Sequence, residues 1–491
     1  MIQIKEFLRL SKEYNVVPIY KEVNADLDTP VSAFLRINDS EYGFLLESVE
    51  GQENLARYSF LGVNPSLIFK SFGERIEIIS ANKVTKFFTS ATPLDEIKKI
   101  MSSFRCAKVR GIPRFCGGMV GFLGYDMVRF FKNLPDKNPD ELRMPDALFM
   151  LMDTILVFDH VAHKIKIVSN AILPEGGRVN LKLKKKIYKE SLRKIDSLYL
   201  RLNRPLKRGK SLKNKTLPLR VSSNFTPKGF KRVVIRAKEF IKKGEVVQVV
   251  LSQRFKLKAP KSPFDIYRSL RSLNPSPYMY FFKLKDIYIV GASPEMLVRC
   301  EDGIIKTRPI AGTRPRGKDE ALDKKLASEL LKDKKERSEH LMLVDLGKDD
   351  LGRVSKAGSV KVSEFMNIER YSHVMHLVSE VKGRLDKGRY DIYDVLKAVF
   401  PAGTVSGSPK MRAMEIIEQL ENIKRGPYAG CVGYFSFLQN MDTCITIRTI
   451  FLKGREAFVQ AGAGIVAESS PNKEYIETVN KAKALIEAIT N

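Results

Sequence analysis

The chain has 491 residues, a formal net charge of +29 and a hydrophobic fraction of 44%, which predicts a globular protein of two or three domains. No apolar run reaches the roughly 20 residues of a membrane-spanning helix, and we expect no secretory signal. The five cysteines form no CxxC pair, which argues against a disulfide framework or thiolate metal site and favours a reducing, cytoplasmic setting.

The first part of the chain is predicted to be rich in strands. Tyr42–Val49 and Ile76–Thr85 carry the β-branched and aromatic side chains typical of strands. Asp95–Phe104 has the spacing of a short amphipathic helix. The glycine-rich Phe115–Asp126 most simply indicates a packed strand with bends. Its GGMVGF segment resembles AGCVGYF at Ala429–Phe435, a weak hint of two related sheet halves.

We expect three parts, namely residues 1–180, a basic connector at 181–222, and residues 223–491. Lys182 to Lys215 contains fourteen basic and two acidic residues. A basic segment of this kind can bind nucleic acid or an anionic surface. Because no nucleic-acid signature accompanies it, a solvated connector is the simpler interpretation.

The last part mixes helices and strands. Thr226–Lys243 has a helical pattern, and Val246–Phe255 is apolar enough to be a central strand. Ile287–Cys300 reads as one further strand with GASPE in its middle. Lys318–Leu346 reads as one long helix that ends at Gly347.

Near the C-terminus, a glycine segment precedes an acidic helix start. Gly462-Ala463-Gly464 is predicted to form a turn, and Ser470-Pro471 suits the beginning of a helix. Glu474 and Glu477 are three residues apart, so both project from one helix face. They can simply complement the helix dipole, or they can help to hold a cation beside a polar substrate.

A second Glu-x-x-Glu pair favours the cation. Glu336 and Glu339 share a face of the predicted long helix, and the apolar Leu341–Leu346 that follows suggests burial. Two such pairs could form the oxygen-only site that Mg²⁺ prefers. The alternative is salt bridging with Lys332 and Lys335.

Histidine is scarce, so His373 and His376 are of interest. Their spacing permits a zinc pair, but no HExxH motif is present, which disfavours zinc. One of them acting as a general acid or base is the sharper hypothesis.

Three basic residues lie in apolar or glycine-rich segments, namely Arg308, Lys410 and Arg448. Each needs an anion, which is either a protein carboxylate or a substrate. Because neither the Walker A nor the Rossmann pattern occurs, a nucleotide is not favoured. These residues therefore suggest a small polyanionic substrate, a hard cation and a histidine.

Long motifs along the whole chain carry a family resemblance. The following segments resemble those of the chorismate-utilising enzymes: GASPEM, TRPIAGTRPRG, EHLMLVDL, YSHVMHLVSEV, FPAGTVSGSPKMRAMEII, YAGCVGYF and AGAGIVAESSPNKEYIETVNKA. LLESVEG…ARYSFLG and NPSPYMYFF resemble the large, aminating component of anthranilate synthases. The resemblance implies an α/β protein of α+β type, with a two-lobed β-sandwich core and helices packed outside.

The resemblance also implies roles for individual residues. Mg²⁺ would be bound by Glu339 and Glu477, supported by Glu336 and Glu474. Proton transfer would involve Glu295, with Thr404 beside it, and His376 in the later loss of pyruvate. The carboxylates of chorismate would be held by Gly312, Thr313, Tyr428, Arg448, Gly462, Ala463 and Gly464. Tryptophan would bind and inhibit at Ser48, Pro277, Tyr278 and Met279.

Two positions distinguish reactions within the family. Gln248 stands where water-adding relatives have a lysine base, so the resemblance implies ammonia as the nucleophile. Ala311 stands where relatives that make 4-amino-4-deoxychorismate carry lysine, which points to anthranilate. At position 349 this chain has aspartate where the family usually has asparagine. Asp349 lies outside the expected contacts with chorismate and Mg²⁺.

The expected function is therefore Mg²⁺-dependent amination of chorismate with loss of pyruvate, the first step of tryptophan biosynthesis. A separate glutamine amidotransferase would supply ammonia in a hetero-oligomer, and neither nucleic acid nor membrane is an expected partner. The alternatives are the sister enzyme that makes 4-amino-4-deoxychorismate and a basic, non-catalytic nucleic-acid binder on the same fold.

Overall fold

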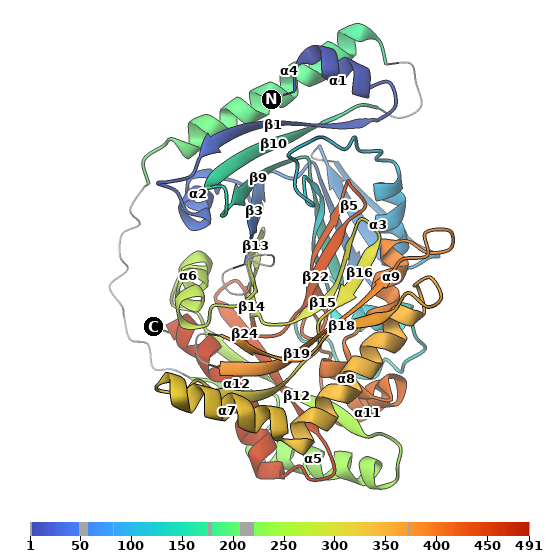
Figure 1. Ribbon diagram of the computed structural model, residues 1–491, viewed down its shortest axis with the longest axis vertical. Helices are drawn as coiled ribbons and strands as arrows, with labels where there is room; N and C mark the ends of the chain where they lie inside the picture. The colour runs from blue at the N-terminus through green and yellow to red at the C-terminus, as the bar shows by residue number, and fades with distance from the viewer. Residues whose placement is uncertain are drawn as a thin grey trace.

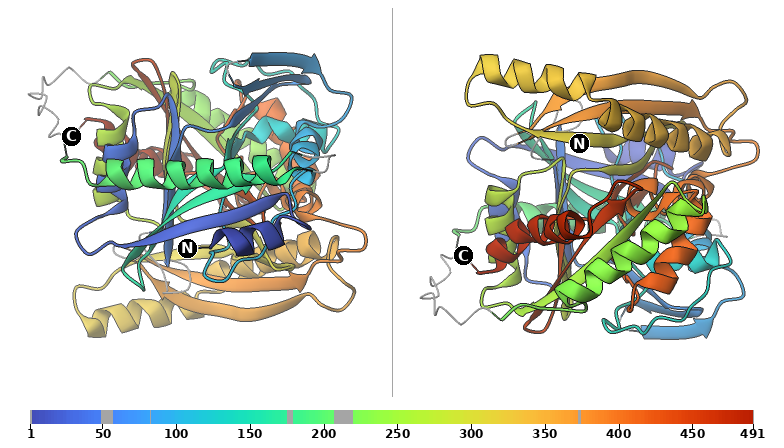
Figure 2. Two further views of the ribbon diagram at one scale, coloured as in Figure 1. Left: turned by 90° about the horizontal axis from the view of Figure 1, so that it is seen from above. Right: turned by 90° about the horizontal axis from the view of Figure 1, so that it is seen from below.

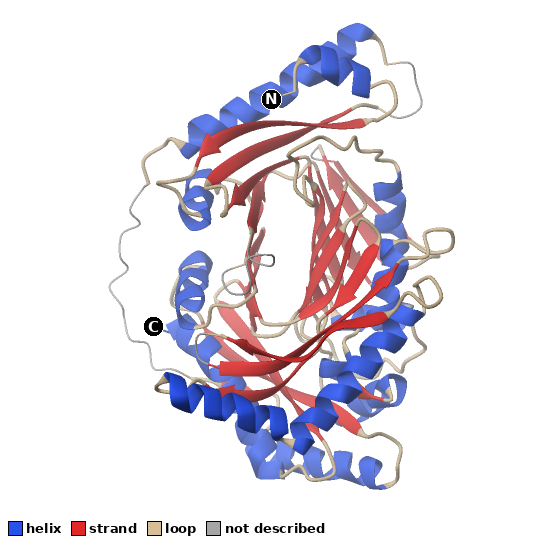
Figure 3. Cartoon of the chain, in the orientation of Figure 1, coloured by secondary structure: helices blue, strands red, loops and turns tan. Residues whose placement is uncertain are grey.

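Two large antiparallel sheets form the centre of the protein, with helices outside them (Figures 1 and 3). The computed structural model describes residues 2–48, 57–81, 83–174, 179–206, 220–371 and 374–490. Each sheet has twelve strands within these residues. The arrangement confirms the mixed α/β class and the helix-covered core of two sheets.

The strands of the first sheet are, in spatial order, β1 (Val16–Asn24), β10 (Lys164–Ile172), β9 (Thr154–Asp159), β3 (Tyr58–Val63), β2 (Tyr42–Glu47), β13 (Tyr278–Leu284), β14 (Ile287–Ser293), β23 (Thr449–Lys453), β24 (Glu456–Ile465), β12 (Gln248–Lys258) and β11 (Ser222–Ser223), with β20 (Gly407–Ser408) paired to β12. Those of the second sheet are β17 (Ile310–Pro315), β19 (Val374–Arg384), β16 (Ile304–Thr307), β15 (Met296–Glu301), β22 (Met441–Ile445), β21 (Cys431–Ser436), β7 (Gly118–Leu123), β8 (Ala147–Met152), β4 (Leu67–Phe72), β5 (Arg75–Ser80) and β6 (Lys83–Phe88), with β18 (Lys361–Arg370) paired to β19.

The helices are α1 (Ile4–Leu10), α2 (Pro30–Ile37), α3 (Pro93–Ser102), the 3-10 helix η1 (Tyr125–Phe130), α4 (Leu181–Leu202), α5 (Pro227–Lys242), α6 (Pro263–Leu273), α7 (Glu320–Lys332), α8 (Lys334–Gly352), α9 (Ile392–Val399), α10 (Gly403–Ser406), α11 (Lys410–Leu420) and α12 (Pro471–Thr490). No helix of the described residues is long and apolar enough to cross a membrane.

The N-terminal and C-terminal parts of the chain share both sheets. Strand β2 pairs with β13 in the first sheet, and β7 pairs with β21 in the second. The two similar glycine segments are therefore neighbours, with Gly121 opposite Gly433. The three-part division of the chain remains a prediction.

Aromatic side chains fill the space between the sheets. Phe60 of the first sheet meets Tyr434 of the second, and Phe115 stacks on Tyr434 with ring centroids 4.2 Å apart. A second apolar cluster lies where α2 and α6 pack on the first sheet, with Phe34 stacked on Phe264. These clusters make the sheets a firm frame for the segments that connect them.

The basic connector begins with α4, which lies across one end of the molecule (Figure 2, left). Its apolar face, with Ile195, Leu198 and Leu202, is buried in the second cluster. Lysines such as Lys182 and Lys185 lie on the exposed face. The rest of the basic run, from residue 207 to 215, lies outside the described residues.

Four local predictions were wrong in detail. Ile76–Thr85 is not one strand but parts of β5 and β6, joined at Ala81, whose φ of 47° permits a tight reversal. Ile287–Cys300 is two strands, β14 and β15, in different sheets. Gly462–Gly464 is not a turn but lies within strand β24.

The fourth concerns the predicted long helix, which is the two helices α7 and α8. Asp333 begins α8 by accepting hydrogen bonds from the backbone of Lys335 and Glu336. The helix continues past Gly347, which packs against Thr307 and Val381. Glu336 and Glu339 therefore lie in the first two turns of α8.

Candidate active site

Glu295 lies in the short link where the chain passes from β14 in the first sheet to β15 in the second. Its Oε1 accepts a 2.8 Å hydrogen bond from Oγ1 of Thr404, at the start of α10. Burial raises the pKa of Glu295 to about 7, although the Thr404 hydrogen bond and the charge of Lys481 lower it. A carboxyl group with such a pKa carries a proton in a large fraction of molecules at neutral pH, which suits a general acid.

His376 is held by the backbone of β17. Its Nδ1 lies 2.9 Å from the Gly312 carbonyl oxygen and 3.1 Å from Oγ1 of Thr313. Because a carbonyl can only accept, Nδ1 carries the proton in this contact. Burial lowers the pKa of His376, so the neutral ring predominates and leaves Nε2 able to accept a proton. Gly312 has a φ of 66° at a bulge in β17, a conformation that glycine adopts readily.

The glycines of β24 make room for two polar side chains. A Cβ atom at Gly462 would lie 2.7 Å from Oη of Tyr428, and one at Gly464 would lie 2.6 Å from Nε2 of Gln248. The Gly462 carbonyl accepts a 2.9 Å hydrogen bond from Nζ of Lys481. Ala463, between the glycines, is fully buried. The close approach of these side chains explains the glycines, and pairing with β12 makes the segment a strand rather than a turn.

The three basic residues selected from the sequence have different partners. Arg308 pairs with Glu369 and Glu364, and Lys410 pairs with Asp350 at 2.7 Å. Protein carboxylates therefore neutralise both.

Arg448 has no ion pair among the described residues. Its Nη1 donates to the Lys481 carbonyl at 3.3 Å. Burial lowers the pKa of Arg448, while Tyr428 and Glu477 raise it. A partly buried guanidinium without a carboxylate partner is suited to binding an anionic ligand.

Lys481 of α12 joins these groups, and its role was not predicted from the sequence. It forms a 2.6 Å ion pair with Glu477, donates to Gly462, and its charge acts on Glu295. Its position one helical turn after Glu477 was the only available signal. Through Lys481, the acid, the glycine strand and Arg448 belong to one site.

The two acidic pairs face this site from α8 and α12. Nε2 of Gln248 donates to Oε1 of Glu339 at 3.2 Å, which connects β12 to α8. Burial raises the pKa of Glu336, and the charge of Glu339 raises it further. Burial likewise raises the pKa of Glu474, and Glu477 adds to the shift.

These carboxylates fit a divalent cation by their chemistry. Each pair contains one group whose pKa is raised by its neighbour, so a cation would relieve their repulsion, and oxygen donors are those that Mg²⁺ prefers. In the described part of the chain, no three acidic, histidine or cysteine side chains converge closely enough to hold a metal ion. Glu477 is instead paired with Lys481, and Glu339 with Gln248.

The four residues expected to bind tryptophan line one cavity between the sheets. Ser48, Pro277, Tyr278 and Met279 surround a space of about 50 Å³. Oγ of Ser48 is buried and has no hydrogen-bond partner among the described residues. The structure therefore brings these residues together, at the ends of β2 and β13.

Three charged residues of the same cavity were missed in the sequence. Asp442 forms an ion pair with Arg299 at 2.8 Å and lies 3.6 Å from Arg114, and it accepts a 3.0 Å hydrogen bond from Tyr278. For Arg299 and Asp442 the available signal was a charge inside an apolar strand, as in MLVRCE, whereas Arg114 lies outside the strands and had no such signal. His373 lies outside the described residues, so its predicted role is untested.

Comparison with known proteins gives consistent results. The family described as chorismate binding enzyme matches residues 44–487. Anthranilate synthase component 1 from Aquifex aeolicus is 48% identical over 489 residues, covering 99% of this chain and 97% of that protein. The corresponding protein from Acetivibrio thermocellus is 47% identical over 487 residues, covering 98% and 96%.

Two solved structures are similar along almost the whole chain. Anthranilate synthase component I from Streptococcus pneumoniae is 37% identical with a TM-score of 0.75, covering 94% of this chain and 99% of that one. The menaquinone-specific isochorismate synthase from Escherichia coli is 20% identical with a TM-score of 0.71, covering 99% of both chains. The second similarity is one of fold.

Proposed function

The chain belongs to the chorismate-binding enzyme family, and we propose that it is the aminating component of an anthranilate synthase, forming anthranilate and pyruvate from chorismate and ammonia. The observation that carries the proposal is that Lys481 links two groups of one site: its charge acts on the protonatable Glu295, and its carbonyl accepts a hydrogen bond from Arg448, which has no ion pair among the described residues. The reaction needs an acid for a departing hydroxyl and a cation for a carboxylate.

Each polar group has a defined task. Arg448 and Tyr428 hold a carboxylate against the backbone of Gly462–Gly464, and Gly312 and Thr313 contribute the opposite wall. Glu295 protonates the C4 hydroxyl as ammonia adds at C2, and Thr404 orients its carboxyl group. The ring of His376 is neutral, and its unprotonated Nε2 removes a proton from the aminated intermediate. Loss of this proton accompanies the departure of pyruvate and gives the aromatic ring.

The position of Gln248 supports ammonia as the nucleophile. An amide side chain cannot deprotonate water, whereas ammonia needs no base for its first attack. Ala311 has no amine that could attack the substrate. The two residues therefore favour anthranilate over isochorismate and over 4-amino-4-deoxychorismate.

Mg²⁺ would be held by Glu339 and Glu477, with Glu336 and Glu474 supporting them. When bound, it supplies a Lewis acid and a template for the carboxylate of chorismate. Before it binds, Lys481 and Gln248 hold the two carboxylates in place.

A glutamine amidotransferase is the proposed partner, and tryptophan is the proposed inhibitor. Component 1 relatives imply a second component by their name. In the cavity at Ser48, Asp442 forms ion pairs with Arg114 and Arg299, and the group thus offers both signs of charge that the ammonium and carboxylate of a free amino acid require. A cytoplasmic setting remains the prediction from the sequence.

The direct test is a fluorescence assay for anthranilate with chorismate, Mg²⁺ and ammonium. We expect a fluorescent aromatic product without any added lyase. A non-aromatic aminated product would instead identify the sister enzyme. Salt-sensitive RNA binding without turnover would favour the nucleic-acid binder.

Replacing His376 with methionine should slow pyruvate release more than amination. A lost general base costs about 10²–10⁴-fold in the step that it serves, so the aminated intermediate should accumulate in rapid-quench samples analysed by chromatography. Thr313→Val, which removes one contact to the same ring, is the matched control and should accumulate little. Equal slowing of both steps would contradict this division of labour.

Replacing Ser48 with phenylalanine should relieve inhibition by tryptophan. A phenyl ring at position 48 would occupy part of the cavity that Ser48 lines, and overpacking of about 1–3 kcal/mol corresponds to a roughly 5–160-fold weaker inhibition constant. Turnover without tryptophan should stay close to that of the parent. Ser197→Phe on the exposed face of α4 serves as the control, and unchanged inhibition of Ser48→Phe would remove Ser48 from the effector site.

A further inference from the structure

A buried ion pair lies behind the proposed chorismate site, and none of the tasks above uses it. Arg425 and Glu421, just after α11, have side chains that are 1% and 2% exposed. Nε of Arg425 donates to Oε2 of Glu421 at 3.0 Å, and Nη2 donates to Oε1 at 2.6 Å. Arg425 is among the largest fully buried side chains of the described residues. Burying two charges is costly unless further hydrogen bonds compensate.

Further hydrogen bonds reach the helix α10 and the strand β12, which carry or adjoin site residues, and three of the four involve backbone atoms. Nη1 of Arg425 donates to the Val405 carbonyl at 2.7 Å, and Nη2 donates to the Val250 carbonyl at 2.8 Å. Oε1 of Glu421 accepts from the backbone nitrogen and from Oγ of Ser252, both at 2.8 Å. One ion pair thus binds α10 and β12 together.

These backbone positions are adjacent to groups that would touch the substrate. Val405 follows Thr404, which donates to Glu295. Val250 lies opposite Gly464 in the sheet, and Ser252 lies opposite Gly462. A shift of the ion pair would therefore move the Thr404 hydroxyl, which contacts Glu295, together with the strand Gly462–Gly464.

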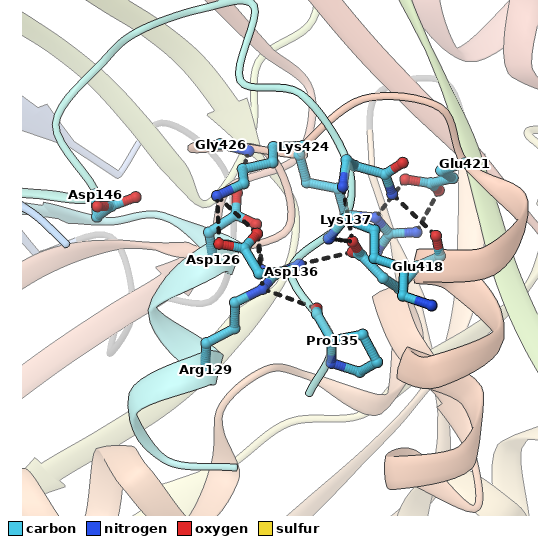
Figure 4. Close-up of polar contacts among 12 residues, drawn as sticks. Asp126, Arg129, Pro135, Asp136, Lys137, Asp146, Glu418, Glu421, Lys424 and Gly426 are labelled. Carbon is cyan, nitrogen blue, oxygen red and sulfur yellow. Dashed lines mark hydrogen bonds and ion pairs between the residues drawn. The ribbon is translucent and has the colours of Figure 1, made fainter. Parts of the chain in front are cut away.

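The guanidinium also touches an aromatic residue of the site. Arg425 lies over the ring of Tyr428 at 5.6 Å and over the ring of Tyr125 at 4.7 Å. The next residue, Gly426, donates its backbone nitrogen to Oδ2 of Asp126 at 2.7 Å. Asp126 is in turn bound to Arg129, which pairs with Glu418 of α11 (Figure 4). This network anchors the turn that leads to Tyr428.

We propose that Arg425 and Glu421 are positioning residues for the chorismate site. They act through the backbone and hold Thr404, the Gly462–Gly464 strand and Tyr428 in one relative geometry, without contacting the substrate. The inference rests on the proposed function, because it concerns the geometry of that same site.

Arg425→Lys tests the inference, because lysine keeps the charge but cannot reach Glu421 and two carbonyls with a planar fork. Misplacement of reacting groups by about 1 Å can cost about 100-fold, so kcat/KM for chorismate should fall by about that factor. Circular dichroism and thermal unfolding should show a folded protein with a cooperative transition. Chorismate binding, measured by calorimetry without ammonium, should weaken as well.

The pH dependence of the reaction distinguishes a positioning role of the ion pair from a purely structural one. The Thr404 hydrogen bond lowers the pKa of Glu295, so displacing Thr404 raises it. Because the protonated acid is the active form, the decline of kcat/KM at alkaline pH should shift to higher pH. Thr404→Val should shift it in the same direction.

A second variant removes both charges together, Glu421→Met with Arg425→Met, so that no unpaired charge stays buried. It should fold and show the same loss in kcat/KM. The matched control replaces Asp28 and Arg36, an ion pair of the α2 region with side chains 22% and 16% exposed, by methionine and should keep the parent values.

Parent-like chorismate binding, kcat/KM and pH profile in a folded Arg425→Lys protein would overturn the inference. So would loss of cooperative unfolding in both Arg425 variants, since the pair would then support the whole fold rather than the site. If the parent itself makes no anthranilate, the proposed function fails. The calorimetric comparison would still report whether the pair positions the chorismate-binding residues.

Discussion

Glu295→Gln is expected to lower kcat for anthranilate formation by about 10²–10⁴-fold, the usual contribution of a general acid. Glutamine keeps the size of the side chain and can still accept the Thr404 hydrogen bond, but it has no acidic proton for the departing hydroxyl. The dissociation constant for chorismate, measured without ammonium, should change little. Steady-state kinetics and calorimetry together separate the two effects.

The pH dependence gives the same residue a second test. Burial raises the pKa of Glu295 to about 7, so the acid form is lost as pH rises through that value, and kcat/KM of the parent, which reports the free enzyme, should decline there. In Glu295→Gln, this decline should be absent from the residual activity. Glu301→Gln, at the end of the adjacent strand β15, is the matched control. A Glu295→Gln enzyme with parent kcat would show that another group protonates the hydroxyl.

Glu477→Gln is expected to abolish Mg²⁺-dependent turnover. Supporting residues around a metal usually contribute about 10–100-fold to its affinity, so loss of a charged direct ligand should weaken Mg²⁺ binding by at least about 100-fold. The substitution also releases Lys481 from its 2.6 Å ion pair, which leaves a positive charge close to the vacated position. Both effects disfavour the binding of a cation at this position.

Calorimetric titration with Mg²⁺ measures this affinity independently of turnover. Glu468→Gln removes the same charge from an exposed position shortly before α12 and should leave Mg²⁺ binding and activity close to those of the parent. Undiminished Mg²⁺ affinity or activity in Glu477→Gln would contradict its assignment as a ligand.

Elements with one clear periodicity were predictable from the sequence. Thr226–Lys243 is close to α5, and the acidic helix begins at Pro471 as expected. Ile287–Cys300 was not resolved into two strands, because both halves are equally apolar and the change of sheet at Glu295 depends on distant partners. Asp333 carries a helix-capping signal, but helical spacing continues on both sides of it.

The composition of the site depended on contacts between distant residues. Glu295 and Thr404 are 109 positions apart, and Gln248 and Glu339 are 91 apart. Spacing rules reach a few residues within one element, so only the family resemblance could suggest these groupings. The residue patterns nevertheless identified both acidic pairs and the unusual basic residues.

The sequence did not determine which anion each of the three basic residues binds. Arg308, Lys410 and Arg448 looked alike in the sequence, yet the first two are neutralised by Glu369 and Asp350. Arg448 alone among the three has no carboxylate partner in the described residues. Whether a buried charge is paired depends on tertiary packing, which no local pattern encodes.

The fate of labelled nitrogen tests the proposed reaction. Chorismate, Mg²⁺ and ¹⁵N-ammonium are incubated with the purified chain, and the products are quantified by mass spectrometry. We expect ¹⁵N-anthranilate and pyruvate in equal amounts, with formation of both suppressed by tryptophan. Isochorismate, or an aminated product that retains its enolpyruvyl group, as the end product would contradict the proposed reaction.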